Sequence, residues 1–364
     1  MVSNGTMPIK KSKMKELAEQ AEVSVATAYR VVKQTAQVSP EREARVLKLA
    51  RDLGIPIRQT TSSKVISFLL GNRPTLHAFH SQVLIGAAAR CAESDFGIQF
   101  FPLYYPATLS PKELPMPGNL QGRNLIDGFI AAGTNSQNLL DRLAETRRPF
   151  AVLGNNMVGE WRPDRCDVVW MDLTETAYQM TRYLLSLGHS DVWFLQNSRL
   201  PWMMHCFEGY SRAMQEGRLE PRSRDFFSED EREAGYLAMK SLLGQKEPVT
   251  AVFAASDYVA LGVYDVIREK GLRVPEDVSV VGVGDRPEVA GLYPALSTLR
   301  GFPEQVGRHL AELVLNRIEE PDKAPQRVAI PSQFIRRDSC GPVRAGLQPA
   351  RKDRTLVVEP EPVS

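Results

Sequence analysis

The sequence predicts an α plus α/β protein, in which a small N-terminal unit of three helices precedes two α/β lobes with a cleft between them. Three observations predict this class. Residues 12–54 carry the start and stop signals of three short helices, strand-like apolar runs alternate with helical stretches over residues 65–340, and the alternation starts again near Asp172. Alternating strands and helices imply parallel sheets, and there are too many units for one small sheet.

The overall composition is that of an ordinary globular chain. The 364 residues include 25 Gly, 25 Pro and 4 Cys, and 43% are hydrophobic; this composition excludes collagen-like, disordered and disulfide-scaffold chains. The cysteines are far apart and form no CxxC pair, so we expect neither a zinc site nor a disulfide framework. No apolar run is long enough to span a bilayer, and the first residues lack the apolar core of a signal peptide. We therefore expect a cytoplasmic protein with no membrane partner.

The charge is distributed unevenly along the chain. The net charge is +2, but residues 1–63 carry eleven Lys or Arg against six Asp or Glu, a surplus of +5 that leaves −3 for the remainder. A basic segment on a mildly acidic body indicates a polyanionic partner for the first segment alone. The alternative is a basic face that is simply solvated.

Three helices fit into the basic unit. Ser12, Ser24 and Ser39 are expected as their N-caps, and Gly54 ends the third helix. About three residues, 21–23, separate the first two helices, which is typical of a helix-turn-helix. Helices this short need a shared core. The apolar positions for that core are Met14, Leu17, Ala18, Ala21, Ala28, Val31, Val32, Val46, Leu49, Ala50 and Leu53.

The second helix presents small and methyl-bearing residues outward, together with an arginine. Val25, Ala26 and Thr27 can touch a thymine methyl group, and Arg30 can reach a guanine or a phosphate. This pattern favours a helix that enters a DNA groove. A three-helix module that docks on another protein is the alternative, although small polar residues make a poor hydrophobic docking face.

The run KMKELAEQAEVSVATAYRVVKQTAQVSPEREARVLKLARDLGI, residues 13–55, resembles the DNA-binding headpiece of the lac repressor family without a gap. The resemblance implies a sequence-specific transcriptional regulator, expected to be a repressor, that binds double-stranded DNA. Two headpieces on a near-palindromic operator give the affinity usual for such proteins, so we expect a homodimer. The expected DNA-binding residues are Lys13, Ser24, Val25, Ala26, Thr27, Tyr29, Arg30 and Lys33.

The headpiece departs from the family pattern at three positions. Glu22 replaces the Gly of the turn, so either the backbone there does not need glycine or it is mildly strained. Tyr29 replaces a Ser of the recognition helix, and it either stacks over the DNA backbone or reaches a base edge. Lys33 replaces the usual Asn. By the resemblance, Val25 and Ala26 are the two positions that choose the operator sequence.

The linker, residues 55–64, is the largest departure. The family usually has a longer segment here, with a hinge helix whose Leu enters the minor groove at the operator centre, but this stretch contains no Leu. Inserting an apolar side chain between base steps kinks DNA. We therefore expect weaker central bending and a flexible tether, because Ile55 and Ile57 lie too close to the third helix to replace the Leu.

Residues 65–340 resemble the effector domain of the same family, which is similar to periplasmic sugar-binding proteins. The resemblance lies in LLSLGHSDVWFL, PVTAVFAASDYVALGVYDVIREKGLRVPEDVSVVGVGD and PALSTLRGFPEQVGRHLAELVL. It implies a two-lobed domain that binds a small-molecule effector, with a sugar as the family-level expectation, and that also dimerises. Residues 1–11 are expected to be a flexible basic start and residues 341–364 a disordered tail.

Candidate effector contacts follow the ends of strands, where ligands of α/β folds bind. Asp257 either lies at the cleft rim or caps a helix, and Trp202 either stacks on a sugar or packs in the core. Cys206 and Ser256 stand where the family usually has Arg and Asn, so the ligand differs or the pocket is vestigial. The expected effector residues are Phe79, His80, Trp202, Cys206, Ser256, Asp257 and Asp285.

Two other classes of function explain the sequence less well. A cytoplasmic solute-binding protein without a regulatory role leaves the basic headpiece unexplained. An enzyme is not expected, because GVGD is a lone G-x-G and no Walker, GxSxG or HExxH motif is present. We expect no cofactor, and no metal site at His77 and His80, which have no carboxylate or thiol nearby in the sequence.

Overall fold

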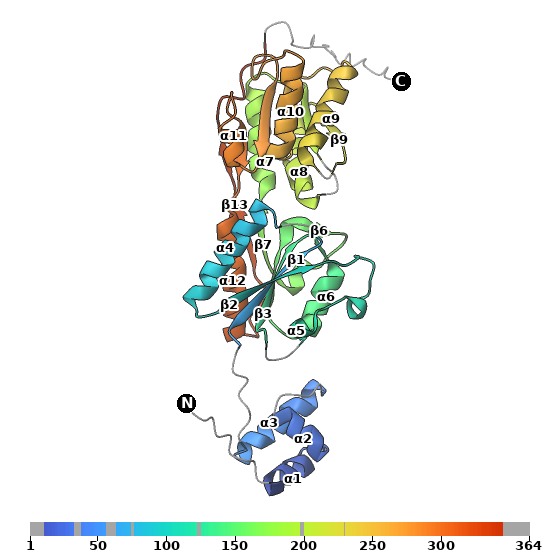
Figure 1. Ribbon diagram of the computed structural model, residues 1–364, viewed down its shortest axis with the longest axis vertical. Coiled ribbons are helices and arrows are strands. Elements are labelled where there is room, and N and C mark those ends of the chain that lie inside the picture. The colour runs from blue at the N-terminus through green and yellow to red at the C-terminus, as the bar shows by residue number, and fades with distance from the viewer. Residues whose placement is uncertain are drawn as a thin grey trace, which may run out of the picture.

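The computed structural model describes residues 11–32, 38–55, 63–73, 76–121, 125–196, 200–228 and 230–344. Figure 1 shows a three-helix headpiece and a body of two α/β lobes, which is the predicted fold class. Several predictions concern residues outside the described ones: the start at 1–10, Lys33, most of the linker with Ile57, and most of the tail.

The headpiece is built on one small core. Its helices are α1 (Lys11–Gln20), α2 (Val25–Val32) and α3 (Pro40–Asp52). The predicted apolar positions form the core, in which Leu49 and Leu53 are partly buried and the others are buried. The prediction of three short helices that share a core is confirmed. One detail is wrong: because α1 begins at Lys11, Ser12 lies inside the helix and does not cap it.

The end of α3 takes in the first residue of the expected linker. Gly54 has a φ of 58°. Its N–H donates to the Arg51 carbonyl, and the N–H of Ile55 donates to the Ala50 carbonyl. These two bonds form a Schellman motif, in which the following apolar residue packs back on the helix. Ile55 is 3% exposed in the headpiece core, so it belongs to the headpiece and its side chain is not available as a minor-groove wedge.

The first lobe contains a six-stranded parallel sheet. The sheet order is β13 (Arg327–Pro331), β7 (Asp167–Asp172), β5 (Phe150–Leu153), β3 (Gly128–Gly133), β1 (Val65–Gly71) and β2 (Gly97–Leu103). Its helices are α4 (Ala78–Glu93), α5 (Gly118–Gln121), α6 (Gln137–Glu145) and α12 (Pro303–Glu319). Smaller elements complete it: η1 (Pro111–Glu113), β4 (Asn135–Ser136), η2 (Gly154–Asn156), β6 (Met157–Val158) and η3 (Pro163–Arg165).

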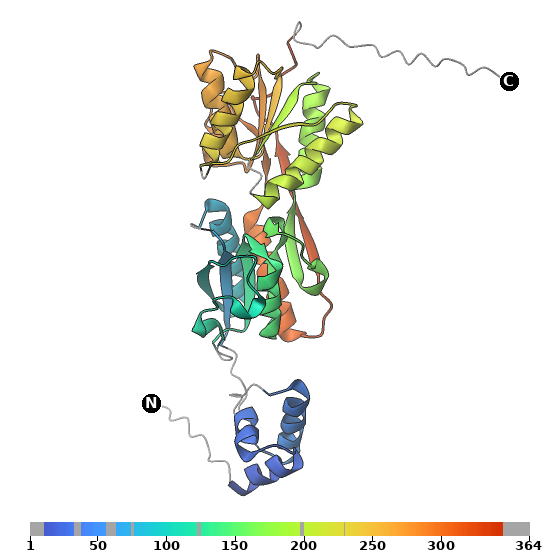
Figure 2. The same cartoon turned by 90° about the vertical axis from the view of Figure 1, so that its right-hand side faces the viewer.

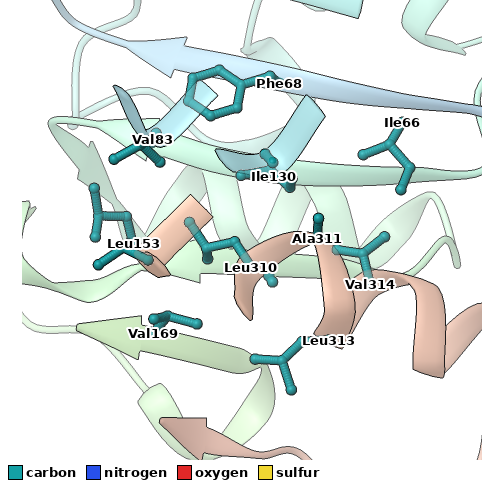
Figure 3. Close-up of a cluster of buried hydrophobic side chains, with 14 of the residues drawn as sticks. Ile66, Phe68, Val83, Ile130, Leu153, Val169, Leu310, Ala311, Leu313 and Val314 are labelled. Atoms are coloured by element: carbon teal, nitrogen blue, oxygen red, sulfur yellow. The ribbon is translucent and has the colours of Figure 1, made fainter. Parts of the chain in front are cut away.

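Both faces of this sheet are buried. In β1, Phe68 lies in the cluster under α4 and α12, whereas Leu69 lies in the cluster on the face of α6. Figure 3 shows the first cluster, where Leu310 and Val314 of α12 lie against the strand residues. A sheet covered on both faces is typical of parallel strands, whose side chains are apolar in both directions.

The second lobe repeats this plan. Its sheet order is β14 (Gln333–Ile335), β12 (Ser297–Arg300), β11 (Ser279–Val283), β10 (Ala251–Ala254), β8 (Val192–Gln196) and β9 (Arg222–Asp225). Of these strands, β14 alone runs antiparallel to its neighbour. The helices are α7 (Leu173–Ser186), α8 (Pro201–Glu216), α9 (Glu231–Gly244), α10 (Asp257–Glu269) and α11 (Pro287–Ala290). The predicted restart near Asp172 is confirmed, because β7 ends there and α7 begins the second lobe.

The chain passes between the lobes at the ends of β7, β12 and β13, and the crossing segments lie side by side (Figure 2). Ser332, after β13, donates a 2.6 Å hydrogen bond from Oγ to the Asp172 carbonyl and lies 2.8 Å from Thr176 Oγ1. After β12, a Cβ at Gly301 would come within 2.7 Å of Met171 Sδ, so this crossing packs closely on the end of β7. The three crossings thus form one packed hinge.

The first residues of the expected tail are attached to the second lobe. The N–H of Val343 donates to the Leu187 carbonyl at 3.0 Å, and Arg344 pairs with Asp277 at 3.2 Å. The prediction that disorder begins at residue 341 is therefore wrong for residues 341–344, and residues 345–364 lie outside the described ones. Within the described part of the chain, no helix has the length and apolar character to cross a membrane.

Candidate DNA-binding face and interlobe site

The helix α2 begins with a cap that joins two of the expected DNA contacts. Ser24 Oγ accepts a 3.0 Å hydrogen bond from the N–H of Thr27 and lies 2.7 Å from Thr27 Oγ1. An N-cap bond of this kind satisfies an amide that has no partner within the helix. The prediction that Ser24 caps the second helix is confirmed.

The outer face of α2 is exposed. Val25 is 47% exposed and Tyr29 is 49% exposed, Ala26 and Arg30 are exposed as well, and Thr27 is half-buried. Arg30 lies along the helix, with Nε donating to the Ala26 carbonyl at 3.2 Å. The predicted DNA-facing residues of α2 therefore share one accessible surface.

Of the two lysines expected to contact DNA, Lys13 is among the described residues and Lys33 is not. Lys13 is exposed on α1, and its Nζ donates to the Leu53 carbonyl at 3.0 Å. Lys33 follows α2 directly but lies outside the described residues. The turn before α2 contains Glu22 at a φ of 56°. Of the two alternatives for Glu22, the structure shows the strained one, because this left-handed region is the one that favours glycine.

A second group of polar residues lies where the two lobes face each other. On the first lobe, these residues follow β1 and begin α4; on the second, they follow β10 and β11 or begin α9. Such positions lie beyond the carboxyl ends of parallel strands, where α/β folds bind ligands. We call this group the interlobe site; it consists of Arg73, His77, His80, Glu231, Ser256 and Arg286.

Electrostatic interactions connect the two halves of the interlobe site. Burial lowers the pKa of Arg73, and Glu231 of the second lobe acts to raise it. Partial burial likewise lowers the pKa of His77; Arg73 and Arg286 lower it further, and Glu231 opposes them. Groups from both lobes therefore act on the same side chains.

His80 is the most deeply buried titratable group of the first lobe's half. It is 5% exposed, its Nδ1 has no hydrogen-bond partner among the described residues, and its ring packs edge-on against Phe79 at 5.2 Å. Burial and then the charge of Arg73 lower the pKa of His80 to about 3. The imidazole is therefore neutral near pH 7. Phe79 is partly buried against the core of the first lobe.

Ser256 and Asp257 begin α10 in different roles. Ser256 is the N-cap: its Oγ accepts from the N–H of Val259 at 3.1 Å and donates to Glu231 Oε2 at 2.5 Å. The alternative that Asp257 caps this helix is wrong. Asp257 is wholly buried, and burial raises its pKa. Its Oδ2 accepts from the N–H of Arg286 at 2.8 Å, which fixes the backbone at the interlobe site.

Asp285 and Arg286 follow β11 but have different partners. Asp285 accepts 2.5 Å hydrogen bonds from Arg300 Nε and Arg337 Nη2, so each oxygen of its carboxylate already has a charged partner. Arg286 stacks its guanidinium over the Tyr258 ring at 4.4 Å. Asp285, one of the expected effector residues, is thus engaged in holding the ends of β12 and β14.

Two expected effector residues belong to the core of the second lobe. Cys206 is wholly buried in the cluster beneath α7 and α8, and burial raises its pKa to about 12. It exposes no surface to a ligand, so the expectation for Cys206 is corrected to a packing role. Trp202 is half-buried and packs against the same cluster, in agreement with its core alternative.

Sequence reasoning missed Arg73, Glu231 and Arg286. Arg73 and Arg286 follow almost directly on the buried strands β1 and β11, so the strand-end rule could have found both. Glu231 carries no such signal, because it begins a helix and reaches the site through the packing of α9 beside α10.

Comparisons with known proteins place both parts of the chain. Residues 13–55 match the family model "Bacterial regulatory proteins, lacI family", and residues 181–340 match the periplasmic binding protein-like domain. The ribose operon repressor of Haemophilus influenzae is 25% identical over 340 residues, which cover 90% of this chain and 98% of that protein. The transcriptional repressor PurR of Pasteurella multocida is 29% identical over 333 residues, covering 87% and 94%.

The fold comparison agrees with the sequence comparison. The solved complex of the transcriptional regulator CelR with cellobiose superposes with a TM-score of 0.66 at 25% identity, covering 90% of this chain and 99% of that one. The headpiece matches a lacI-type domain, the body is a two-lobed binding-protein fold, and the relatives match over nearly their whole length. These findings indicate the same kind of protein. The chain is a DNA-binding transcriptional regulator whose headpiece matches the lacI family.

Proposed function

We propose that this regulator represses transcription by binding a near-palindromic operator as a homodimer, and that a small molecule bound at the interlobe site controls that binding. The observation that carries the DNA-binding role is the exposed face of α2. Its N-terminal residues Val25 and Ala26 are small enough to approach base edges, and Arg30 on the next turn reaches a guanine or a phosphate.

The N-terminus of α2 also suits a phosphate. Ser24 and Thr27 present hydroxyl groups there, next to the amides and the positive end of the helix dipole, which favour anions. Lys13, exposed on α1, is a further expected phosphate contact. Phosphate contacts of this kind set the register on DNA, whereas Val25 and Ala26 supply the choice of sequence.

Two observations support a homodimer. A single headpiece covers few base pairs, and two headpieces on symmetric half-sites one helical turn apart reach the usual affinity of about 10⁻⁸–10⁻¹¹ M. The first lobe also exposes apolar side chains just before α4, on α4 and on the edge strand β2: Leu76 is 38% exposed, Ile85 57% and Phe100 38%. Pairing through this surface would remove them from water.

Selection of bound duplexes from a random library tests the DNA-binding role, with and without a metabolite extract. We expect a near-palindromic site whose enrichment changes when the extract is present. Replacing Val25 and Ala26 should change the selected sequence, whereas Lys15→Ala on α1 serves as a matched control that changes affinity alone. The proposal is contradicted if no sequence is enriched from the library. It is also contradicted if every Val25 and Ala26 variant selects the same sequence as the unsubstituted protein.

A further inference from the structure

We propose that the effector is a small hydroxylated anion, such as a sugar acid or a sugar phosphate, whose negative charge is held by Arg73 and Arg286 from opposite lobes. This inference rests on the proposed effector role of the interlobe site and names the ligand class of that site. Three features of the site support it: an arginine on each lobe that has no ion-pair partner among the described residues, positively charged neighbours, and polar groups suited to hydroxyls.

The arginine of the first lobe lacks a close anionic partner. Arg73 is half-buried, its Nε is buried without a hydrogen-bond partner, and no carboxylate of the described residues lies within ion-pair distance of it. A buried guanidinium without a paired anion is costly, and an anion that supplies the missing bonds compensates for that cost. The carboxylate that acts on it electrostatically, Glu231, lies on the other lobe and is hydrogen-bonded to Ser256.

The arginine of the second lobe is held in place without being neutralised. The backbone N–H of Arg286 donates to the buried Asp257, and its guanidinium lies over the ring of Tyr258. Among the described residues it has no ion-pair partner. A fixed, planar guanidinium presents paired N–H donors that match the geometry of a carboxylate or a phosphate.

Glu231 and Asp257 act electrostatically on Arg73 and Arg286, but neither carboxylate forms an ion pair with these arginines among the described residues. Asp285 could have served as a counter-ion for Arg286, but its two oxygens are bonded to Arg300 and Arg337. That cluster therefore carries a net positive charge of its own. A bound anion would be stabilised by the whole group, whereas a neutral sugar would leave both interlobe arginines without a charged partner.

The remaining polar groups suit hydroxyls. The neutral imidazole of His80 keeps an unpartnered Nδ1, which can donate or accept depending on its tautomer. Glu231, oriented by the 2.5 Å bond from Ser256, offers a carboxylate that accepts from ligand hydroxyls. A ligand with an acidic group at one end and hydroxyls along its length would therefore meet complementary groups on both lobes.

Calorimetric titration of the full-length protein tests the ligand class with three matched probes: D-glucose, D-gluconate and D-glucose 6-phosphate, supplemented by ribose and ribose 5-phosphate. We expect heat from at least one acid or phosphate at concentrations up to about 1 mM and none from its neutral counterpart. The carboxylate and phosphate probes separate the two sources of negative charge.

Three variants locate the binding. Arg286→Gln and Arg73→Gln should each weaken binding of the anion roughly ten-fold or more, because each removes a charge-assisted pair of hydrogen bonds. Glu231→Gln keeps an oxygen that accepts from a ligand hydroxyl and removes a nearby negative charge, so it should strengthen binding of the anion. Arg212→Gln, on α8 and paired there with Glu175, is the matched control and should leave the affinity unchanged.

The inference would be overturned if a neutral sugar bound with an affinity that Arg73→Gln and Arg286→Gln do not change. It would also be overturned if none of the probes produced heat of binding. DNA selection with the same protein preparations distinguishes failure of the anion proposal from failure of the proposed DNA-binding function. A protein that selects an operator but binds no anion remains a regulator with a different effector, whereas one that binds the anion but selects no DNA contradicts the proposed function alone.

Discussion

Arg45 of α3 donates a 2.9 Å hydrogen bond to the carboxylate of Glu22, which occupies the turn of the helix-turn-helix at a φ of 56°. The ion pair links the turn to the third helix. Its side chains are 46% and 76% exposed, so solvent weakens it and its net contribution is below about 1 kcal/mol. The left-handed backbone costs roughly as much for a residue with a Cβ.

Substitutions at Glu22 separate these two effects. Glu22→Gly relieves the backbone and loses the pair, whereas Glu22→Ala loses the pair and keeps the strain. We expect the Gly variant to be the more stable by about 1 kcal/mol, measured as slower hydrogen exchange of headpiece amides in the full chain. In the Glu22→Ala background, Arg45→Ala should change the hydrogen-exchange rates of the headpiece little further, because the ion pair is already absent. Equal exchange in the Gly and Ala variants would show that the turn is unstrained.

Substitutions at Ser24 distinguish capping from phosphate contact. Ser24→Ala removes the cap and should reduce headpiece stability by about 1 kcal/mol. Ser24→Asp keeps a capping oxygen and suits the helix dipole, but it places a negative charge beside the expected phosphates. We therefore expect Ser24→Asp to retain its exchange protection and to lose more DNA affinity than Ser24→Ala. Unimpaired binding by the Asp variant would place Ser24 away from the DNA.

Tyr29 and Arg30 are expected to act on DNA in different ways. If Arg30 contacts a phosphate, Arg30→Ala should weaken all duplexes alike and reduce the salt slope by about one unit; if it contacts a guanine, one position of the selected site should lose its preference. Tyr29→Ser should alter the selected site only if the hydroxyl reads a base edge. The same site for wild type and Tyr29→Ser would assign Tyr29 to the DNA backbone or to no contact.

The sequence of the linker predicts that the operator is only weakly bent in the complex. Ile55 is fixed in the headpiece core and the linker contains no Leu, so no apolar wedge of the family type is expected at the centre. Gel mobility of circularly permuted operator fragments should show little bending. Ile55→Ala should destabilise the headpiece by about 2–4 kcal/mol and leave the bend of the remaining complex unchanged. A sharp central kink would mean that another side chain acts as the wedge.

His80 makes stability depend on pH. Its pKa in the folded protein is about 3, below the value of about 6.5 expected when the chain is unfolded. Between these values the unfolded chain binds more protons, so stability falls as the pH drops below about 6.5 and the loss continues down to about 3. From pH 7 to pH 5 the loss from this one group is about 2 kcal/mol.

Urea unfolding at the two pH values measures this loss. His80→Gln should reduce the difference between pH 7 and pH 5 by the amount assigned to His80. An undiminished pH dependence in His80→Gln would show that the imidazole is accessible to protons in the folded protein.

Features that are set by neighbouring residues could be predicted from the sequence, whereas features that depend on long-range packing could not. Ser24, Gly54 and the apolar spacing of the headpiece were readable because a cap, a helix stop and a buried face are all set within one or two helical turns. Strand-like runs such as residues 65–70 were readable for the same reason. The roles of Cys206 and Asp257 were not, because whether a side chain faces a ligand or a core depends on what packs over it.

The return of the chain to its first lobe shows the same division. The helix α12 and the strand β13 come after all but one strand of the second lobe, yet β13 pairs with β7 and α12 covers the first sheet. The sequence by itself predicted which segments are helices or strands and that residues 12–54 form a DNA-binding unit. Only the tertiary structure decided that Arg73 and Arg286 share one site, because periodicity reveals which faces must be buried and not which distant segment covers them.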